Sequence, residues 1–120
     1  MENKKFGTEG EVMAVKYLTN SGYKIKATNW YYKHKEIDIV AEKDEILSIV
    51  EGKTRSSNFC ETPNELVPRK KQRFLIEAAE AYIQKNDIEH EIQFDLITIY
   101  FKNGKRNLQH ITEAFEPHLL

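Results

Sequence analysis

The sequence of 120 residues contains one cysteine, three prolines and five glycines. The single thiol, Cys60, has no partner for an intramolecular disulfide, so we expect a protein that is made in a reducing compartment. No apolar run approaches the roughly 20 residues that cross a bilayer. The first residues, 1–5, are not followed by an apolar signal stretch. These absences predict a cytoplasmic protein without a membrane association.

Net charge is also small, because 18 basic residues are set against 19 acidic ones. A net charge of −1 does not by itself predict a nucleic-acid-binding protein. The basic residues are unevenly distributed, however, and a local basic face is enough to contact phosphates. The segment 53–73 holds Lys53, Arg55, Arg69, Lys70, Lys71 and Arg73.

Apolar residues make up 40% of the chain and charged residues 31%, which is typical of a globular domain. A chain of this length can bury a core of its own but has no room for a second one. We therefore expect a single domain over residues 1–120.

Apolar periodicity predicts two helices and five strands. The helices are expected at 6–21, where Gly22 ends the first one, and from Pro68 to about Asn86, after an irregular loop over 56–67. The strands are expected at 23–30, 36–42, 46–54, 92–101 and 107–111. The order α-β-β-β-α-β-β predicts an α/β fold in which a mixed sheet is flanked by helices.

The second and third strands are separated by a short polar loop, which predicts a hairpin. If this hairpin is centred on residues 44–45, Val40 lies opposite Ile49 and Asp38 lies opposite Glu51. Side chains that are directly paired have Cβ atoms about 4.5–5.5 Å apart. Two carboxylates are therefore expected to face each other within two apolar strands.

Such a pair repels itself unless one carboxylate is protonated or a cation bridges them. Hard oxygen ligands at this separation suit Mg²⁺, which keeps its waters and binds phosphate. An alternative interpretation is a solvated face, in which Glu36 and Lys53 form a cross-strand ion pair and the other two acids contact water.

The segments 36–40 (EIDIV) and 49–55 (IVEGKTR) resemble the signature of PD-(D/E)xK nucleases. The chain as a whole is similar to the small YraN-like bacterial family, which is related to Holliday-junction resolvases. Further matching positions are Gly7, Gly10, Glu11, Ala14, Tyr17, Leu18, Gly22 and Tyr23 in and after the first helix, Lys71, Arg73, Ala78, Ala79 and Tyr82 in the second, and 94–97 in a late strand.

This resemblance implies a restriction-endonuclease-like core that hydrolyses phosphodiester bonds with Mg²⁺, or Mn²⁺. Asp38 and Glu51 would ligate the metal, Lys53 would orient the attacking water, and Glu11 would be an outer acid. The implied substrate is structured or branched DNA, with RNA left open. Relatives with this core often work as dimers, because cutting two DNA strands needs two active sites. The resemblance therefore also implies a possible homodimer.

Two positions depart from the family pattern. Lys35 stands where a glycine is usual, and Gly52 stands where an apolar residue such as valine is usual. A glycine inside a strand predicts a loss of packing beneath the site. It also fits a bulge, which would shift Lys53.

Glu11 has an alternative interpretation, because Thr8 and Glu11 have the spacing of a capping box at a helix start. The cations Arg69, Lys70, Lys71 and Arg73 oppose the dipole of the second helix, and a phosphate would relieve this. Arg55 and Ser57 follow the signature strand and could contact a phosphate or be ordinary loop residues.

The remaining candidates are weaker. Stacking of Trp30, Tyr31 and Tyr32 on unpaired bases competes with core packing, which we favour. Asp95 is expected to be structural, bonded to Arg73 or another basic group. No role is assigned to Cys60 or to His34, His90, His110 and His118, which lack the spacing of metal ligands.

Two further functions stay open beside the nuclease. One is a catalytically silent nucleic-acid-binding module with the same fold. The other is an interaction scaffold whose basic helix end meets an acidic partner protein and has no nucleic-acid role.

Overall fold

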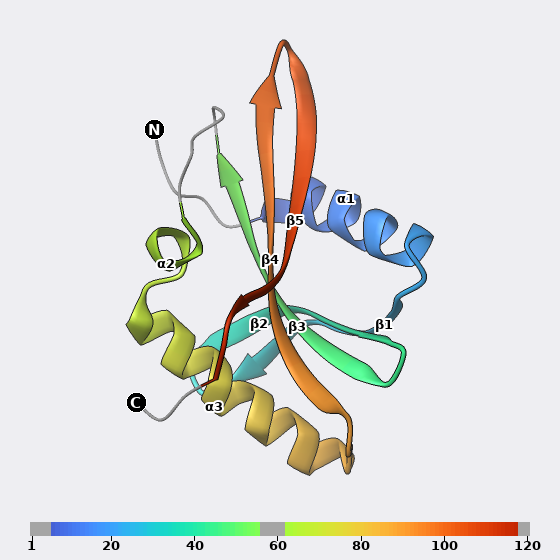
Figure 1. Cartoon of the computed structure of the whole chain (residues 1–120), viewed down its shortest axis with the longest axis vertical. Helices are drawn as coiled ribbons and strands as arrows, with labels where there is room; N and C mark the ends of the chain where they lie inside the picture. Colours follow the sequence, from blue (N-terminus) through green and yellow to red (C-terminus); the bar gives the residue numbers. More distant parts are fainter. Residues whose placement is uncertain (1–5, 56–61, 118–120) are drawn as a thin grey trace.

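A computed structural model describes residues 6–55 and 62–117. It confirms an α/β architecture in the expected order and adds one short helix between β3 and α3 (Figure 1). The predictions for Ser57, Cys60 and His118 lie outside the described residues. The elements are α1 (Gly7–Asn20), β1 (Lys24–Tyr32), β2 (Lys35–Lys43), β3 (Ile46–Arg55), α2 (Pro63–Leu66), α3 (Arg69–Asn86), β4 (Glu91–Lys102) and β5 (Lys105–Phe115).

The five strands form one sheet in the order β1-β2-β3-β4-β5. Neighbours are antiparallel except β3 and β4, which are parallel because α2 and α3 connect them. The loops of the β2–β3 and β4–β5 hairpins are two-residue turns with positive φ at both residues, at 44–45 and at 103–104. Such turns match the twist of the strands that they join. Figure 1 shows the β4–β5 hairpin extending beyond the rest of the sheet.

The register predicted for the β2–β3 hairpin is confirmed where the two strands pair. Val40 lies opposite Ile49, and the ladder ends one step later at Ile39 and Val50. Beyond that point β3 continues along β4, in register as far as Arg55. No shift occurs at Gly52, so the alternative of a bulge there is wrong.

Two apolar clusters pack against the sheet. One joins α3 to strand residues such as Leu47, Ile49 and Leu96. The other joins α1, through Ala14 and Leu18, to residues such as Val50 and Ile97. Because alternate residues of β3 and β4 belong to different clusters, α1 and α3 cover opposite faces of the sheet (Figure 1).

The loop predicted over 56–67 is wrong at its end, where 63–66 form the short helix α2. A capping box begins this helix: the Thr62 hydroxyl accepts from the Glu65 N–H, and the Glu65 carboxylate accepts from the Thr62 N–H. Pro68 is the N-cap of α3 and lies just before its first turn. Among the residues that the structure describes, no helix is long and apolar enough to cross a membrane.

Candidate functional site

A cavity of about 460 Å³ lies between the beginning of α1 and strands β1 and β2. Three carboxylates line it, from two elements. Glu11 comes from α1, and Glu36 and Asp38 come from β2. The complete lining is Phe6, Gly7, Thr8, Glu11, Asn29, Tyr31, Glu36 and Asp38. The structure therefore brings Glu11 to the same cavity as Asp38.

The capping-box interpretation of Glu11 is wrong. Helix α1 begins at Gly7, its N-cap is Phe6, and no side chain caps it. Thr8 thus lies within the helix, because the chain enters the helical conformation before it. Glu11 is half-buried at the cavity wall.

Asp38 is 4% exposed and lies one residue beyond the last β2–β3 pair. Its Oδ2 accepts a hydrogen bond of 2.8 Å from the backbone N–H of Gly52. Because Gly52 directly follows Glu51, this bond ties the two predicted metal ligands together through one peptide unit. The bond takes the place of the next backbone pair where β2 and β3 separate.

Glu51 is completely buried on the α3 side of β3. Its Oε2 lies 3.5 Å from Nζ of Lys53 and 3.5 Å from Nζ of Lys71, a residue of the first turn of α3. Within residues 6–55 and 62–117, neither carboxylate oxygen has a hydrogen-bond partner. A buried carboxylate in this state is costly unless a positive group compensates it.

The donor chemistry of Asp38 and Glu51 fits a hard divalent cation. The described part of the chain contains no group of three or more His, Cys, Asp or Glu side chains gathered closely enough to hold an ion. Mg²⁺ does not require such a group, because it is commonly bound through one or two carboxylates, with waters and phosphate oxygens filling the other positions.

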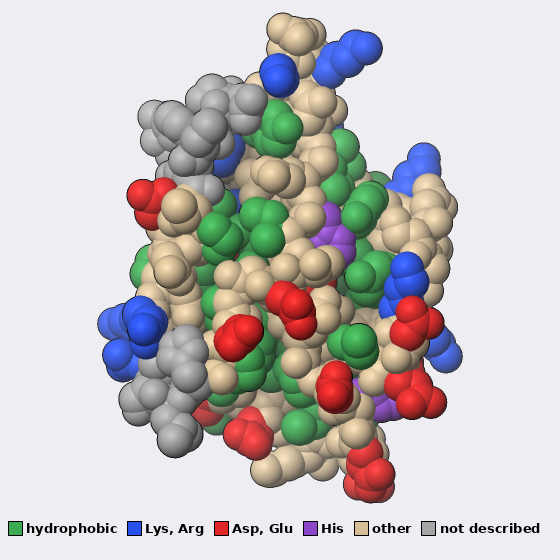
Figure 2. All heavy atoms as spheres, in the orientation of Figure 1, with side chains coloured by type: hydrophobic (Ala, Val, Ile, Leu, Met, Phe, Trp, Pro, Cys, Tyr) green, Lys and Arg blue, Asp and Glu red, His purple; other side chains and the backbone are tan. Residues whose placement is uncertain are grey.

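The basic residues predicted to contact nucleic acid do not form one surface. Arg69, Lys70 and Arg73 are exposed at the beginning of α3, where Figure 2 shows a group of Lys and Arg side chains. The Lys71 side chain is only 18% exposed and points to Glu51 instead. Arg55 is 2% exposed, and its guanidinium donates to the Thr54 carbonyl at 3.4 Å. It is therefore buried and not accessible to a phosphate, in contrast to the prediction.

Core packing is confirmed for two of the three consecutive aromatic residues. Trp30 makes an edge contact with Tyr82 at 5.1 Å between ring centroids, and Tyr32 lies 6.1 Å from Phe74. Tyr31 is 69% exposed and lines the cavity.

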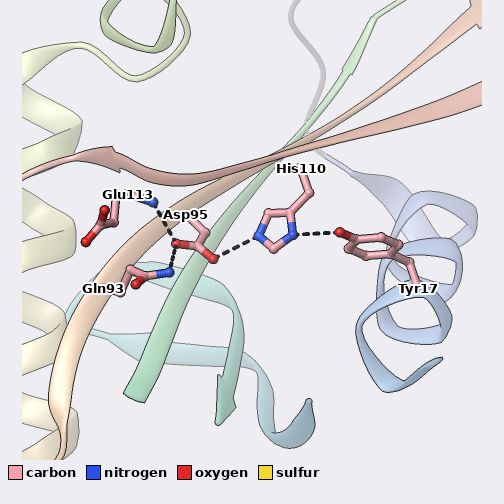
Figure 3. Close-up of polar contacts among 5 residues, drawn as sticks. All are labelled: Tyr17, Gln93, Asp95, His110 and Glu113. Carbon is pink, nitrogen blue, oxygen red and sulfur yellow. Dashed lines mark hydrogen bonds and ion pairs between the residues drawn. The ribbon is translucent and has the colours of Figure 1, made fainter. Parts of the chain in front are cut away.

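A buried polar network on the α1 side was not expected from the sequence (Figure 3). His110 Nε2 lies 2.8 Å from Asp95 Oδ2, and His110 Nδ1 lies 2.9 Å from the Tyr17 hydroxyl. The second carboxylate oxygen, Oδ1, accepts from the Gln93 amide and from the Glu113 backbone N–H. Asp95 is therefore structural, and its basic partner is His110.

This network fastens α1 to the irregular part of the β4–β5 ladder. The register shifts between Phe94 and Leu96, and Glu113, opposite that shift, has a positive φ of 52°. At the register shift the Glu113 N–H does not pair within the ladder. It donates to the Asp95 carboxylate instead. The sequence signal for His110 is weak: it lies two residues after Leu108 and therefore on the same face of β5.

The comparisons with known proteins agree over nearly the whole chain. The sequence profile described as "Uncharacterised protein family UPF0102" matches residues 10–99. A UPF0102 protein of Flavobacterium psychrophilum is 40% identical over 114 residues, covering 95% of this chain and 96% of the relative. A UPF0102 protein of Bacteroides thetaiotaomicron is 42% identical over 118 residues, covering 98% of both. The chain belongs to the uncharacterised protein family UPF0102.

Proposed function

We propose that this protein is a metal-dependent nuclease of restriction-endonuclease-like fold that hydrolyses phosphodiester bonds in structured DNA. The observation that carries the proposal is Glu51. It is a fully buried carboxylate whose two oxygens have no hydrogen-bond partner among the described residues, one peptide unit from Asp38. A cation held by both carboxylates would compensate this arrangement.

In this proposal Asp38 and Glu51 hold Mg²⁺ or Mn²⁺. The bound metal would lower the pKa of a water and neutralise a phosphate oxygen. Lys53 and Lys71, both 3.5 Å from Glu51, add positive charge where the phosphate becomes more negative during attack. Glu11 faces the cavity from α1 and can accept a hydrogen bond from water beside Asp38.

The exposed cations at the beginning of α3 provide contacts to the DNA backbone. Arg69, Lys70 and Arg73 are exposed in the first two turns, and the N-terminal end of a helix also attracts phosphate. Structured DNA is the proposed substrate by analogy, because the YraN-like family that the chain resembles is related to Holliday-junction resolvases.

A catalytically silent DNA-binding module is the second candidate, and one observation favours it. Two lysine ammonium groups already lie beside Glu51, so the carboxylate is partly neutralised without a metal. Such a protein would bind DNA in a salt-dependent way but would give no metal-dependent product.

The test is cleavage of labelled four-way-junction, flap, single-stranded and duplex DNA with Mg²⁺ or Mn²⁺ and with EDTA. Asp38→Asn and Glu51→Gln are compared with Glu80→Gln, a matched change of an exposed carboxylate on α3. The proposal predicts that the wild type and Glu80→Gln cut DNA only when metal is present, and that Asp38→Asn and Glu51→Gln do not cut. Binding without cutting supports the silent module, and neither binding nor cutting overturns both.

Metal binding is tested independently of activity. A ligand that binds only the folded state at about 100 times its Kd stabilises it by about 2.7 kcal/mol. Mn²⁺ should therefore raise the melting temperature of the wild type and of Glu80→Gln, but not that of Asp38→Asn or Glu51→Gln. Equal shifts in all four proteins would show that the metal binds elsewhere.

A further inference from the structure

Tyr31 differs from both of its aromatic neighbours on β1. Trp30 and Tyr32 pack against aromatic side chains of α3, whereas Tyr31 is 69% exposed, more than any other large apolar side chain among the described residues. Removing an aromatic face of this size from water is favourable, so an exposed tyrosine beside a cavity is a ready contact for a flat ligand.

The position of Tyr31 is more specific than its exposure. It lines the acidic cavity that contains Glu11 and Asp38. It also lines a second hollow of about 330 Å³, whose other lining residues are His34, Lys35, Glu36 and Lys71. Tyr31 therefore stands at the boundary between the proposed metal site and a hollow that contains two lysines.

A nucleic-acid strand has the same alternation of chemistry, because its phosphates follow one another with a flat base attached between them. A phosphate beside Asp38 would be held through the metal, and a neighbouring phosphate could contact Lys35, which lines the second hollow. The base between them would lie over Tyr31. Such stacking tolerates every base, because each has a π-face, but a base inside a duplex is already stacked on its neighbours.

We propose that Tyr31 stacks on an unpaired base, so that this site selects DNA strands that are single-stranded, flapped or open at a junction. The choice of ligand rests on the function proposed above, but the stacking itself does not require cleavage. The inference thus names the structural feature of the DNA that this protein recognises.

The experiment measures binding of a fluorescently labelled single strand and of the corresponding duplex by anisotropy, in Ca²⁺, which takes carboxylate oxygens as ligands but at longer distances than Mg²⁺, so that the strand can bind without being cut. Tyr31→Ala removes the ring and Tyr31→Phe keeps it. Phe101→Ala is the matched control, because Phe101 is another exposed aromatic residue, 46% exposed at the end of β4 and outside both hollows. Melting temperatures confirm that the variants are folded.

Loss of one stacked base lowers affinity about 5- to 150-fold. Tyr31→Ala should lower affinity for the single strand by this factor and leave duplex binding unchanged, while Tyr31→Phe and Phe101→Ala keep the wild-type preference. A 2-aminopurine base in the strand should be quenched by the wild type and by Tyr31→Phe but not by Tyr31→Ala. The inference is overturned if Tyr31→Ala weakens neither substrate or both equally.

The two proposals fail separately. A Tyr31-dependent preference for single strands in a protein that never cuts would overturn the nuclease and support the stacking site. Metal-dependent cutting with no effect of Tyr31→Ala on binding would support the nuclease and overturn the stacking site. Binding of no oligonucleotide at all would overturn both, and would leave Tyr31 as a contact for something other than nucleic acid.

Discussion

The Phe6 ring occupies the space that a side chain at Gly52 would need. A Cβ atom built on Gly52 would lie 2.1 Å from both Cε2 and Cζ of Phe6, which is far inside van der Waals contact. The ring also lies against Gly10 of α1, where a Cβ would be 3.2 Å from Cδ1. The loss of packing predicted for Gly52 is therefore wrong, because a residue from the segment before α1 fills the space between the two glycines.

This relationship predicts a compensating pair of substitutions. Gly52→Val should clash with Phe6 and lower the free energy of unfolding by about 1–3 kcal/mol. Phe6→Ala should lower it by about 3 kcal/mol through the cavity that it leaves. In the double variant the valine fills that cavity, so we expect it to be more stable than Phe6→Ala alone. Urea unfolding measures all four proteins, and strictly additive losses would contradict the shared space.

Much of the fold could be predicted because its determinants are local. The apolar periods of α1, α3 and the strands depend on neighbouring residues, and the two-residue turn at 44–45 fixed the pairing of Val40 with Ile49. The short helix α2 was missed although Thr62 and Glu65 have the spacing of a capping box at its beginning. The box expected at Thr8 failed because α1 begins earlier, at Gly7.

The candidate site could be predicted only in part, for a physical reason. The hairpin register brings Asp38 and Glu51 near each other, but the ladder ends at Ile39 and Val50, so the direct pairing predicted for the two acids is not formed. The contact of Lys71 with Glu51 depends on how α3 packs against the sheet, which no local pattern specifies. The bond between Tyr17 and His110 joins residues 93 positions apart, and the Phe6 contact crosses from the chain's first described residue to β3.

Lys71 and Lys70 should have different roles although they are adjacent in α3. Lys71→Ala removes one of the two cations beside the buried Glu51, and we expect it to lower the free energy of unfolding of the metal-free protein by about 1–3 kcal/mol. Lys70 is exposed, so Lys70→Ala should change stability by less than about 0.5 kcal/mol. Denaturant unfolding in EDTA measures both, and equal small effects would show that the Lys71 contact does not stabilise Glu51.

The same pair of variants separates their effects on DNA binding. If Lys70 contacts a phosphate, Lys70→Ala should reduce the slope of log affinity against log salt by about 1. Lys71 is directed at Glu51, so in the proposed nuclease its replacement should lower kcat more than affinity. The opposite assignment, with the salt slope changed only by Lys71→Ala, would contradict the geometry.

Asp95 should require its charge for the stability of the fold. Its Oδ1 accepts two N–H donors and its Oδ2 faces His110 Nε2, so all three partners need an acceptor. An asparagine offers one acceptor oxygen and turns an NH₂ group toward a donor. Asp95→Asn should therefore lower the free energy of unfolding by about 1–3 kcal/mol. Glu113→Gln is the control, because only the backbone of Glu113 takes part, and it should leave stability unchanged.

The alkaline limit of stability should depend on Tyr23. Burial raises the pKa of this phenol, and the charge of Asp95 raises it further. A raised pKa means that the folded state holds the proton more tightly than the unfolded state does. The contribution of Tyr23 to the free energy of unfolding is thus fully present below the pKa of about 10 that the phenol has in the unfolded state. It is lost as the pH rises through the higher pKa of the folded state. Tyr23→Phe, which cannot ionise, should lose less stability than the wild type above that pH.

The measurement is the free energy of unfolding of wild type and Tyr23→Phe by urea between neutral pH and the alkaline limit. The difference between the two proteins should stay constant up to the unfolded pKa and then change in favour of the phenylalanine variant. Tyr100→Phe is a suitable control, because Tyr100 is also a partly buried tyrosine, on β4. A difference that stays constant over the whole range would mean that Tyr23 ionises equally easily in the folded and unfolded states.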